Sequence, residues 1–291
     1  MKGFASEIDS SLYKKRLNLV AGSGMLVYGG TMFMLNELWY KQFERTSFHW
    51  FDDSKGWMQI DKWGHIHSAY FESIWSIESL KWAGVPAKKA AVYGAGVAFT
   101  YQSTIELLDG FSAKWGASYT DIMANALGCL TAMSQELKWG NQALIVKYSF
   151  HPKKYDDKQL QERSESLFGT QWNEVFLKDY NGQTYWVSLN LKQFYKNSKV
   201  PEWLNIAYGY SAENMFGGEE NKWRGSEGMV YRYDMPRYRQ HFLSLDVDFS
   251  KIPCQKKGLK TLLVFLNTFK MPFSSLAYDR INGLHFLPIY F

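Results

Sequence analysis

The residues best placed to do chemistry stand in three short polar clusters within otherwise apolar stretches. These clusters are Asp61-Lys62-Trp63-Gly64-His65, Glu106-Leu107-Leu108-Asp109-Gly110 and Asp121-Ile122-Met123-Ala124-Asn125. Each cluster contains two ionisable or amide side chains three or four residues apart, a spacing that puts both on one face of a helix. The pattern predicts three helices that turn polar side chains toward a common interior point.

The first cluster suits acid–base chemistry. Asp61 stands four residues before His65, and a carboxylate beside an imidazole fixes the tautomer of the ring and raises its basicity. His65 could then act as a general base or a metal ligand, with Glu106 or Asp109 as the acid. The structural alternative is that Asp61 stabilises the start of its helix through the helix dipole while His65 only faces inward.

The other two clusters also allow a structural interpretation. Glu106 and Asp109 come near the end of a predicted helix, where the helix dipole disfavours negative charge, although Asp109 could also take part in a C-terminal turn. Asp121 follows Ser118 by three residues, close to a capping box. Asn125 lies one turn deeper among apolar residues, where an amide needs a buried partner.

Helical periodicity dominates the N-terminal half. We predict helices over residues 12–40, 61–83, 87–110 and 119–139, and their short connections favour an antiparallel bundle. The uncharged run Leu17–Asn36 has the length of a membrane span. We expect it to be a partly membrane-embedded or bundle-core helix of the mature protein, and a removed export signal or a different natural start stays open.

The C-terminal half has strand-like alternation. Residues 184–190, 204–210 and 241–249 alternate with period two, whereas residues 261–270 favour a short helix. The predicted fold class is therefore α+β: an antiparallel four-helix bundle, membrane-associated, followed by a smaller antiparallel β-rich region. The predicted domains are a helical bundle carrying the polar motifs (1–150), a polar linker (151–163) and an aromatic-rich β-region (164–291).

Composition narrows the partners. Aromatic residues make up 18% of the chain, with 12 Trp and 19 Tyr, a level typical of proteins at membrane interfaces. The alternative is an aromatic-rich soluble core with exposed tyrosines. The net charge of +5 is too balanced to predict nucleic-acid binding. Cys129 lies in a small apolar run and is expected to be a buried thiol, although a disulfide with Cys254 stays open. No motif predicts a cofactor.

A family resemblance arises from the order of the polar motifs. The residues that carry it are Asp61-Lys62-x-x-His65-x-x-x-Ala69-Tyr70, Glu106-x-x-Asp109-Gly110-Phe111 and Ser118-x-x-Asp121-x-x-x-Asn125-x-x-Gly128. This order, over about residues 57–140, resembles the YfiM-like family of predicted periplasmic lipoproteins, in the version with a C-terminal extension found in Bacteroidota. It is more distantly similar to VanZ-like membrane proteins. The resemblance implies a location in the cell envelope, at the outer membrane or its periplasmic face. No lipobox cysteine stands near the N-terminus, so lipidation is not expected.

Two classes of function follow. The first is a non-enzymatic envelope protein, an accessory or structural subunit of an envelope complex, with membrane lipid and an envelope protein as partners. Its polar network would consist of Asn125, Asp121, Tyr70 and Lys62 beside the motif acids. The second is a hydrolase or transferase acting on a lipid or cell-wall precursor, with His65, Asp61, Glu106 and Asp109 as catalytic residues. A variant of the second holds a divalent metal on His65, Glu106 and Asp121. Whether the chain is an enzyme stays open at this point.

Overall fold

The structure, a computed structural model, describes residues 10–41, 43–226 and 228–291. The chain forms two compact units, each discontinuous in sequence. Among the described residues, the first unit, here called the helical unit, comprises those up to 53 and those from 68 to 142; the second, the sheet unit, comprises those from 54 to 67 and from 143 to 291. Helix α2 contributes its first two turns to the sheet unit and the rest to the helical unit.

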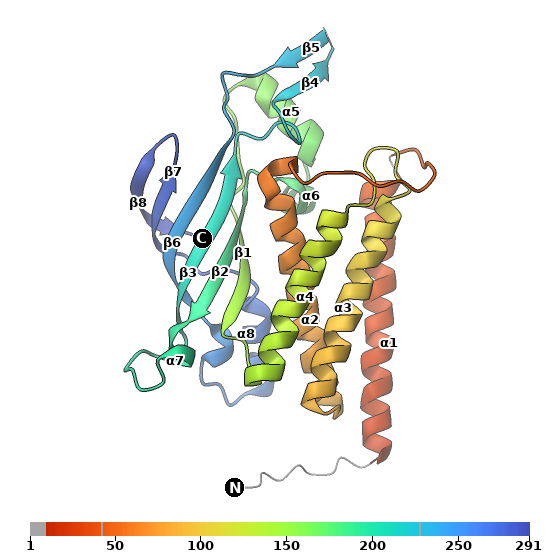
Figure 1. The fold of residues 1–291 in the computed structure, drawn as a ribbon, viewed down its shortest axis with the longest axis vertical. Helices are drawn as coiled ribbons and strands as arrows, with labels where there is room; N and C mark the ends of the chain where they lie inside the picture. Colours follow the sequence, from red (N-terminus) through yellow and green to blue (C-terminus); the bar gives the residue numbers. More distant parts are fainter. Residues whose placement is uncertain (1–9, 42, 227) are drawn as a thin grey trace. The chain divides into compact units, whose positions relative to one another are not determined.

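Helices and strands follow one another along the chain as labelled in Figure 1. The N-terminal half consists of α1 (Ser10–Leu35), a π-helical turn η1 (Asn36–Tyr40), a 3-10 turn η2 (Gly56–Gln59), α2 (Ile60–Ala83), α3 (Ala87–Asp109) and α4 (Tyr119–Trp139). The C-terminal half consists of β1 (Leu144–Phe150), α5 (Lys158–Phe168), α6 (Trp172–Lys178), β2 (Gln183–Asn190), α7 (Leu191–Phe194), β3 (Leu204–Glu213), β4 (Lys222–Gly225), β5 (Gly228–Tyr231), β6 (Tyr238–Val247), η3 (Phe249–Lys251), α8 (Lys257–Leu266), β7 (Phe273–Asp279) and β8 (Gly283–Tyr290).

Small residues bring the helices of the helical unit close together. Ala69, Ala95, Ala98 and Cys129 form a buried cluster shared by α2, α3 and α4. A Cβ atom at Gly94 of α3 would lie 2.7 Å from the backbone nitrogen of Ile77 in α2, so only glycine allows this approach. The free thiol of Cys129 is buried here, as predicted, and both cysteines of the chain are free.

The four predicted helices are confirmed, but the packed bundle consists of α2 to α4. Helix α1 has no buried residue, so the alternative that it forms part of a bundle core is wrong. Among the described residues, α1 is the one helix long and apolar enough to cross a membrane. A signal sequence near an N-terminus has the same properties.

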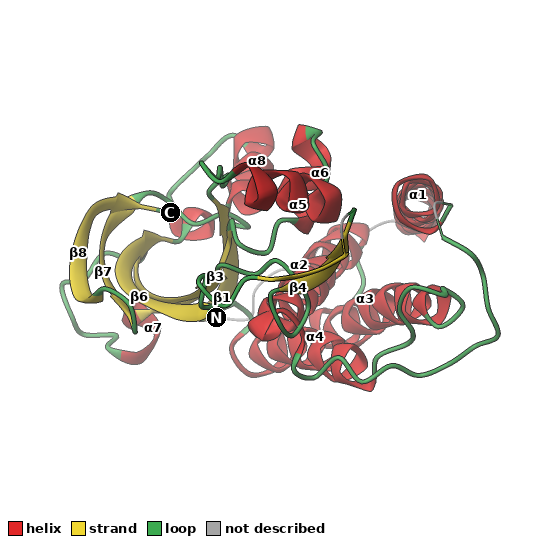
Figure 2. Ribbon diagram, turned by 90° about the horizontal axis from the view of Figure 1, so that it is seen from above, coloured by secondary structure: helices red, strands yellow, loops and turns green. Residues whose placement is uncertain are grey.

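An antiparallel sheet dominates the sheet unit. Its strand order is β1-β2-β3-β6-β7-β8, while β4 and β5 form a separate two-stranded ribbon. The sheet is strongly curved when viewed from above (Figure 2). The proline of β8, Pro288, lies in an edge strand, where a missing N–H group is tolerated. These elements confirm the α+β class and the three predicted strands.

Both faces of the sheet carry aromatic clusters. On one face, Tyr148, Tyr185 and Tyr210 pack against Ile60 from the first turns of α2. On the other, Trp186 and Phe242 contact Tyr290, whose ring stacks on Phe242 with centroids 4.3 Å apart. Tyr290 also stacks on His151 at 4.5 Å and shares a 3.0 Å hydrogen bond with Thr184. Strand β8 therefore contacts β2 through Thr184, and the end of β1 through His151, which follows that strand.

Two segments have a different secondary structure from the one that the sequence predicts. Residues 144–150, expected within the helical bundle, form strand β1, and residues 158–163 of the expected linker belong to helix α5. The run Leu144-Ile145-Val146-Lys147-Tyr148 is an apolar strand interrupted by one lysine. The helix predicted at 261–270 is α8, which begins and ends four residues earlier.

Candidate functional site

The predicted site residues divide between the two units. Asp61, Lys62 and His65 belong to the sheet unit, whereas Tyr70, Glu106, Asp109, Asp121 and Asn125 belong to the helical unit. Each group has its own geometry, described separately below. The convergence of all eight on one point stays a prediction.

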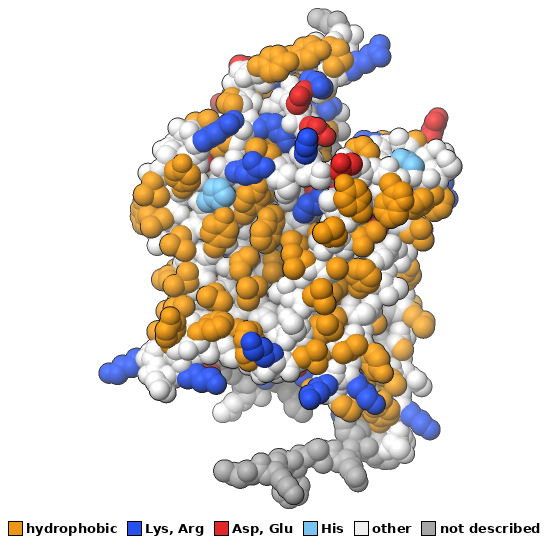
Figure 3. Space-filling view, viewed as in Figure 1, with side chains coloured by type: hydrophobic (Ala, Val, Ile, Leu, Met, Phe, Trp, Pro, Cys, Tyr) orange, Lys and Arg blue, Asp and Glu red, His pale blue; other side chains and the backbone are white. Residues whose placement is uncertain are grey.

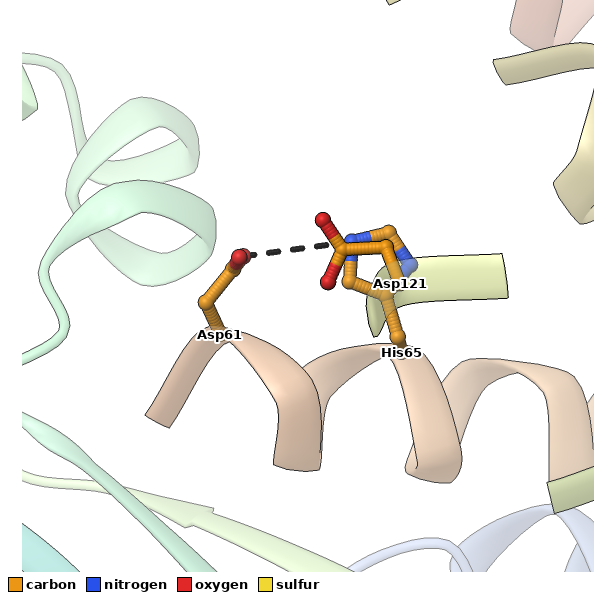
Figure 4. A group of neighbouring side chains, drawn as sticks. All are labelled: Asp61, His65 and Asp121. Carbon is orange, nitrogen blue, oxygen red and sulfur yellow. Dashed lines mark ion pairs between the residues drawn. The ribbon is translucent and has the colours of Figure 1, made fainter. Parts of the chain in front are cut away.

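Asp61 is the centre of the first group. Its Oδ1 atom accepts a hydrogen bond from the Tyr180 hydroxyl at 2.9 Å and lies 3.9 Å from His65 Nε2, while Lys62 Nζ donates to Oδ2 at 3.1 Å. Figure 4 shows His65 one turn after Asp61 on α2, with their ion pair dashed; Asp121, also drawn, belongs to the helical unit. The side chains of Asp61 and His65 are 20% and 18% exposed. At 3.9 Å the two attract electrostatically without a hydrogen bond.

A strained turn precedes this group. Trp57, Met58 and Gln59 all have φ between 49° and 65°, the left-handed region that non-glycine residues rarely adopt. Such conformations cost about 1–3 kcal/mol each and persist where surrounding contacts impose them. Here the Met58 carbonyl accepts from the Tyr210 hydroxyl, and the Gln59 side chain bonds Ser54 and Arg239. The turn therefore fixes where α2 begins and where Asp61 points.

Tyr180 is a site residue that the sequence did not reveal. It follows Asp179 in a turn before β2, where the Asp179 carboxylate accepts from the amide of Asn181 at 3.1 Å. Burial raises the pKa of Asp179 to about 6, although hydrogen bonds from Asn181 oppose that shift. No periodicity links residue 180 to residue 61, so the hydrogen bond between them is visible only in the fold.

Asp179 gives the first prediction. A folded-state pKa above the unfolded value means that its contribution to stability is fully present below about pH 4 and is lost as the pH rises through 6. Asp179→Asn removes this titration while its amide oxygen can still accept from Asn181. We expect the variant to gain about 2–3 kcal/mol over the parent between pH 4 and pH 7. Denaturant unfolding across this range measures the difference, with the exposed Asp156→Asn as control; a constant difference between parent and variant would contradict the prediction.

In the helical unit, Glu106 and Ser118 join the end of α3 to the start of α4. Glu106 is 2% exposed, and its Oε2 atom accepts from the Ser118 amide at 3.2 Å. The Ser118 hydroxyl accepts from the Asp121 amide at 3.1 Å, the N-cap bond that the sequence predicts. Asp53 also accepts from the hydroxyls of Ser118 and Thr120, at 2.6 and 2.8 Å. Asp53 was missed because it stands in a loop far from α4 in sequence.

Asp109 has a local partner. Its Oδ1 atom accepts from the indole N–H of Trp115, six residues later. The Trp115 ring packs edge-on against Phe43 with centroids 5.0 Å apart. The carboxylate therefore closes the turn between α3 and α4, which agrees with the structural alternative for this residue.

Tyr70 and Asn125 are both fully buried. The Tyr70 hydroxyl donates to Gln142 at 3.3 Å, and Gln142 also accepts from Gln135, toward the C-terminal end of α4. Gln135 stands 14 residues after Asp121, roughly 21 Å along a helix. The hydrogen bond from Tyr70 to Gln142 therefore lies toward the opposite end of α4 from Asp121.

The metal alternative combines residues of different units. His65 belongs to the sheet unit, whereas Glu106 and Asp121 belong to the helical unit. Imidazole and carboxylate groups form a plausible ligand set for zinc. The proposed set stays a prediction.

A second polar group that the sequence did not reveal lies inside the sheet unit. Lys147 Nζ is 2.8 Å from Asp246 Oδ2, and both side chains are 0% exposed. Ser188 donates to the same oxygen at 2.6 Å, and the buried Lys270 ammonium contacts Ser244 at 3.4 Å. One signal was present: a lysine within the apolar run of β1.

Comparison with known proteins gives one match. A family model described as "Predicted periplasmic lipoprotein (DUF2279)" matches residues 49–136. No curated protein and no solved structure matches the chain. The matched span contains all three polar motifs, and the finer resemblances to YfiM-like and VanZ-like proteins stay predictions. Residues 49–136 are thus similar to a domain of predicted periplasmic lipoproteins, a description that specifies the cell envelope and no reaction.

Proposed function

We propose that the chain is a non-enzymatic protein of the cell envelope, associated with the outer membrane as an accessory or structural subunit of an envelope complex. The envelope location is supported by the family match over residues 49–136. The observation that carries the non-enzymatic role is the hydrogen bond from the Ser118 amide to the nearly buried carboxylate of Glu106. A carboxylate used in this way holds two helix ends together, and its burial keeps it from a substrate.

Exposed apolar residues of the helical unit support the membrane association. Met123, Leu127 and Leu130 share one face of α4 and are 67%, 54% and 53% exposed. On α1, Met25 and Leu26 are 74% and 78% exposed. Soluble monomers seldom expose such apolar faces, which mark contact with lipid or a protein partner.

A different observation favours a second candidate function, that of an enzyme. Asp61 and His65 form an ion pair in which each side chain keeps about a fifth of its surface exposed. A hydrolase or transferase acting on a lipid or cell-wall precursor would use the neutral imidazole of His65 as the base, with the Asp61 carboxylate beside it. Tyr180 and Lys62 also bond Asp61, so the carboxylate is equally explained as a structural centre.

The two candidates predict different results for His65→Ala. A structural role predicts that a strain carrying this variant loses envelope integrity only as far as the abundance of the protein falls, because the protein then acts through its fold and not through the imidazole as a base. Resistance of intact cells to detergent, compared with the parent and with a deletion strain, is the measurement. Protein abundance in the membrane fraction is measured in parallel.

Glu106→Leu is the matched variant. It leaves the Ser118 amide without its acceptor, which is expected to cost about 1–3 kcal/mol and to lower abundance and integrity together. Deletion-like sensitivity for His65→Ala at normal abundance would overturn the non-enzymatic proposal in favour of the enzyme.

A further inference from the structure

The sheet buries many of its polar residues and exposes many of its apolar ones, the reverse of a sheet with one face in water. Along β6, Gln240, Ser244 and Asp246 are buried, whereas Leu243 and Leu245 between them are 51% and 45% exposed. An antiparallel sheet with one face in water normally buries its apolar residues and exposes its polar ones. Apart from the cluster of Trp186, Ala207, Phe242 and Ala277, the buried side is polar and the exposed side apolar, the pattern of strands that face lipid.

Neighbouring strands repeat this inversion. In β3, Asn205 is fully buried and Ile206 is exposed, and in β7, Ser275 is buried and Leu276 is exposed. Register places Tyr208, Leu243, Leu276 and Phe286 side by side in one row across four strands. We call the outer sheet face the nine apolar residues between 37% and 72% exposed on these strands: Ile206, Tyr208, Leu243, Leu245, Leu276, Tyr278, Leu284, Phe286 and Ile289.

Polar and aromatic residues border the outer sheet face along the strand direction. At one end, the Tyr208 hydroxyl and His241 Nδ1 are 2.6 Å apart, and the exposed Arg239 lies two residues before His241 on β6. Near the other end, Trp203 precedes β3 and is 38% exposed. Amphipathic aromatic and basic side chains gather at the two borders of a bilayer. Figure 3 shows hydrophobic side chains over the strands, with Lys and Arg side chains above and below them.

The strands are long enough to enter a bilayer. β3 and β6 each contain ten residues, which at about 3.3 Å per residue span roughly 33 Å. On β6 the outward-facing apolar residues run from Leu243 to Val247, roughly 13 Å, so at a tilt of about 40° they cover roughly 10 Å along the membrane normal, a depth within one leaflet.

Helix α8 of the same unit supplies a second observation. Leu259, Leu262, Phe265 and Leu266 lie on one side of the helix and are between 37% and 50% exposed. Lys256 precedes the helix and Lys260 is exposed within it. An apolar helix face flanked by basic residues is typical of helices that lie in the headgroup region of anionic membranes.

We propose that the outer sheet face is a lipid-facing surface that contacts the acyl chains of a phospholipid bilayer, with α8 in the adjoining headgroup region. The inference deepens the membrane association of the proposed function and rests on its envelope location. It identifies the sheet, in addition to the apolar helix faces, as the part of the chain immersed in lipid. The buried Lys147–Asp246 pair then belongs to a polar interior enclosed by the strands.

The test places a fluorescent probe on single cysteines in the full-length chain. Cys129→Ala and Cys254→Ser remove the two native thiols, and Leu243→Cys or Leu276→Cys introduces one on the outer sheet face. Tyr233→Cys is the matched control, since Tyr233 is 81% exposed in the loop after β5. The protein is reconstituted into phosphatidylethanolamine–phosphatidylglycerol vesicles with or without brominated acyl chains. Quenching by the bromine reports contact with acyl chains, and quenching by aqueous iodide reports contact with water.

We expect brominated lipid to quench the probes at 243 and 276 at least threefold more strongly than the probe at 233, and iodide to show the reverse order. Iodide quenching at 243 and 276 equal to that at 233 would overturn the proposal. Shielding of the probes from both quenchers, together with disulfide dimers formed on oxidation of the unlabelled Leu243→Cys protein, would also overturn it by identifying a second copy as the occupant. The readout is independent of His65 and Glu106, so failure here is distinguishable from failure of the non-enzymatic role.

Discussion

Asp246→Asn is expected to destabilise the sheet unit by about 3–5 kcal/mol, because it removes the negative charge beside a buried cation. The Lys147 ammonium lies 2.8 Å from Asp246 with no exposed surface, and Lys270 lies buried nearby. The variant would leave both lysines inside the sheet without this carboxylate. Denaturant unfolding of the full-length chain, followed by tryptophan fluorescence, measures the loss; Trp186, on the same face of the sheet as Asp246, is one of the 12 tryptophans that contribute to the signal.

A double variant separates the effect of charge on the stability of the sheet unit from the effect of side-chain packing. Lys147→Met combined with Asp246→Asn should recover part of the loss, since it removes one of the uncompensated cations. Asp279→Asn is the matched control: Asp279 is also buried on this face, but it accepts hydrogen bonds from the turn at Ile281 and Asn282. Equal losses for Asp246→Asn and Asp279→Asn, or no recovery in the double variant, would contradict the charge argument.

Two glycines of α3 are expected to respond in opposite directions to alanine. A Cβ atom at Gly94 would lie 2.6–3.0 Å from three atoms of Ile77, two of them backbone atoms that cannot move without separating α2 from α3. Overpacking of this kind costs about 1–3 kcal/mol. At Gly96 the same atom would meet nothing within 4 Å, so alanine should stabilise α3 by about 0.5–1 kcal/mol.

The comparison is internally controlled, because both substitutions change one helix by one methyl group two residues apart. Thermal unfolding of Gly94→Ala and Gly96→Ala, followed by circular dichroism at the helix band, should place their midpoints on opposite sides of the parent. Midpoints that both lie above the parent would show that helix propensity, and not the approach to Ile77, dominates at residue 94.

The helices could be predicted from the sequence because their ends carry local signals. Gly84 and Pro86 stop α2, and Ser118 caps α4 through its own side chain. Strand β1 was missed because it begins five residues after α4 ends, and its signal is an apolar run that also fits a buried helix.

The alternation of polar and apolar residues in β6 could also be predicted from the sequence, but which of the two sets is buried could not. Period two separates Leu243 and Leu245 from Ser244 and Asp246 without saying which set is buried. The ordinary expectation buries the leucines, whereas the structure buries Ser244 and Asp246. That outcome depends on Lys147 and Lys270, which come from other elements and supply the partners that polar residues need inside a fold.

In the candidate site, hydrogen bonds between residues close in sequence could be predicted, whereas those between residues far apart in sequence could not. The N-cap bond between Ser118 and Asp121 follows from their spacing. The bonds from Tyr180 to Asp61, and from the Ser118 hydroxyl to Asp53, join residues 119 and 65 positions apart. Such pairs have no periodic signature, so a single sequence does not reveal them.

The division of α2 between two units has a consequence for the order of events during synthesis. Met58 accepts a hydrogen bond from Tyr210, a residue 152 positions later. At about 5–20 residues per second, a ribosome needs roughly eight to thirty seconds to make that stretch. The helical unit can assemble in this interval. The apolar side chain of Ile60 stays exposed to solvent until the strands that bury it have been synthesised. The nascent chain should therefore be most vulnerable to aggregation, and most dependent on a chaperone, between the emergence of α4 and that of β3.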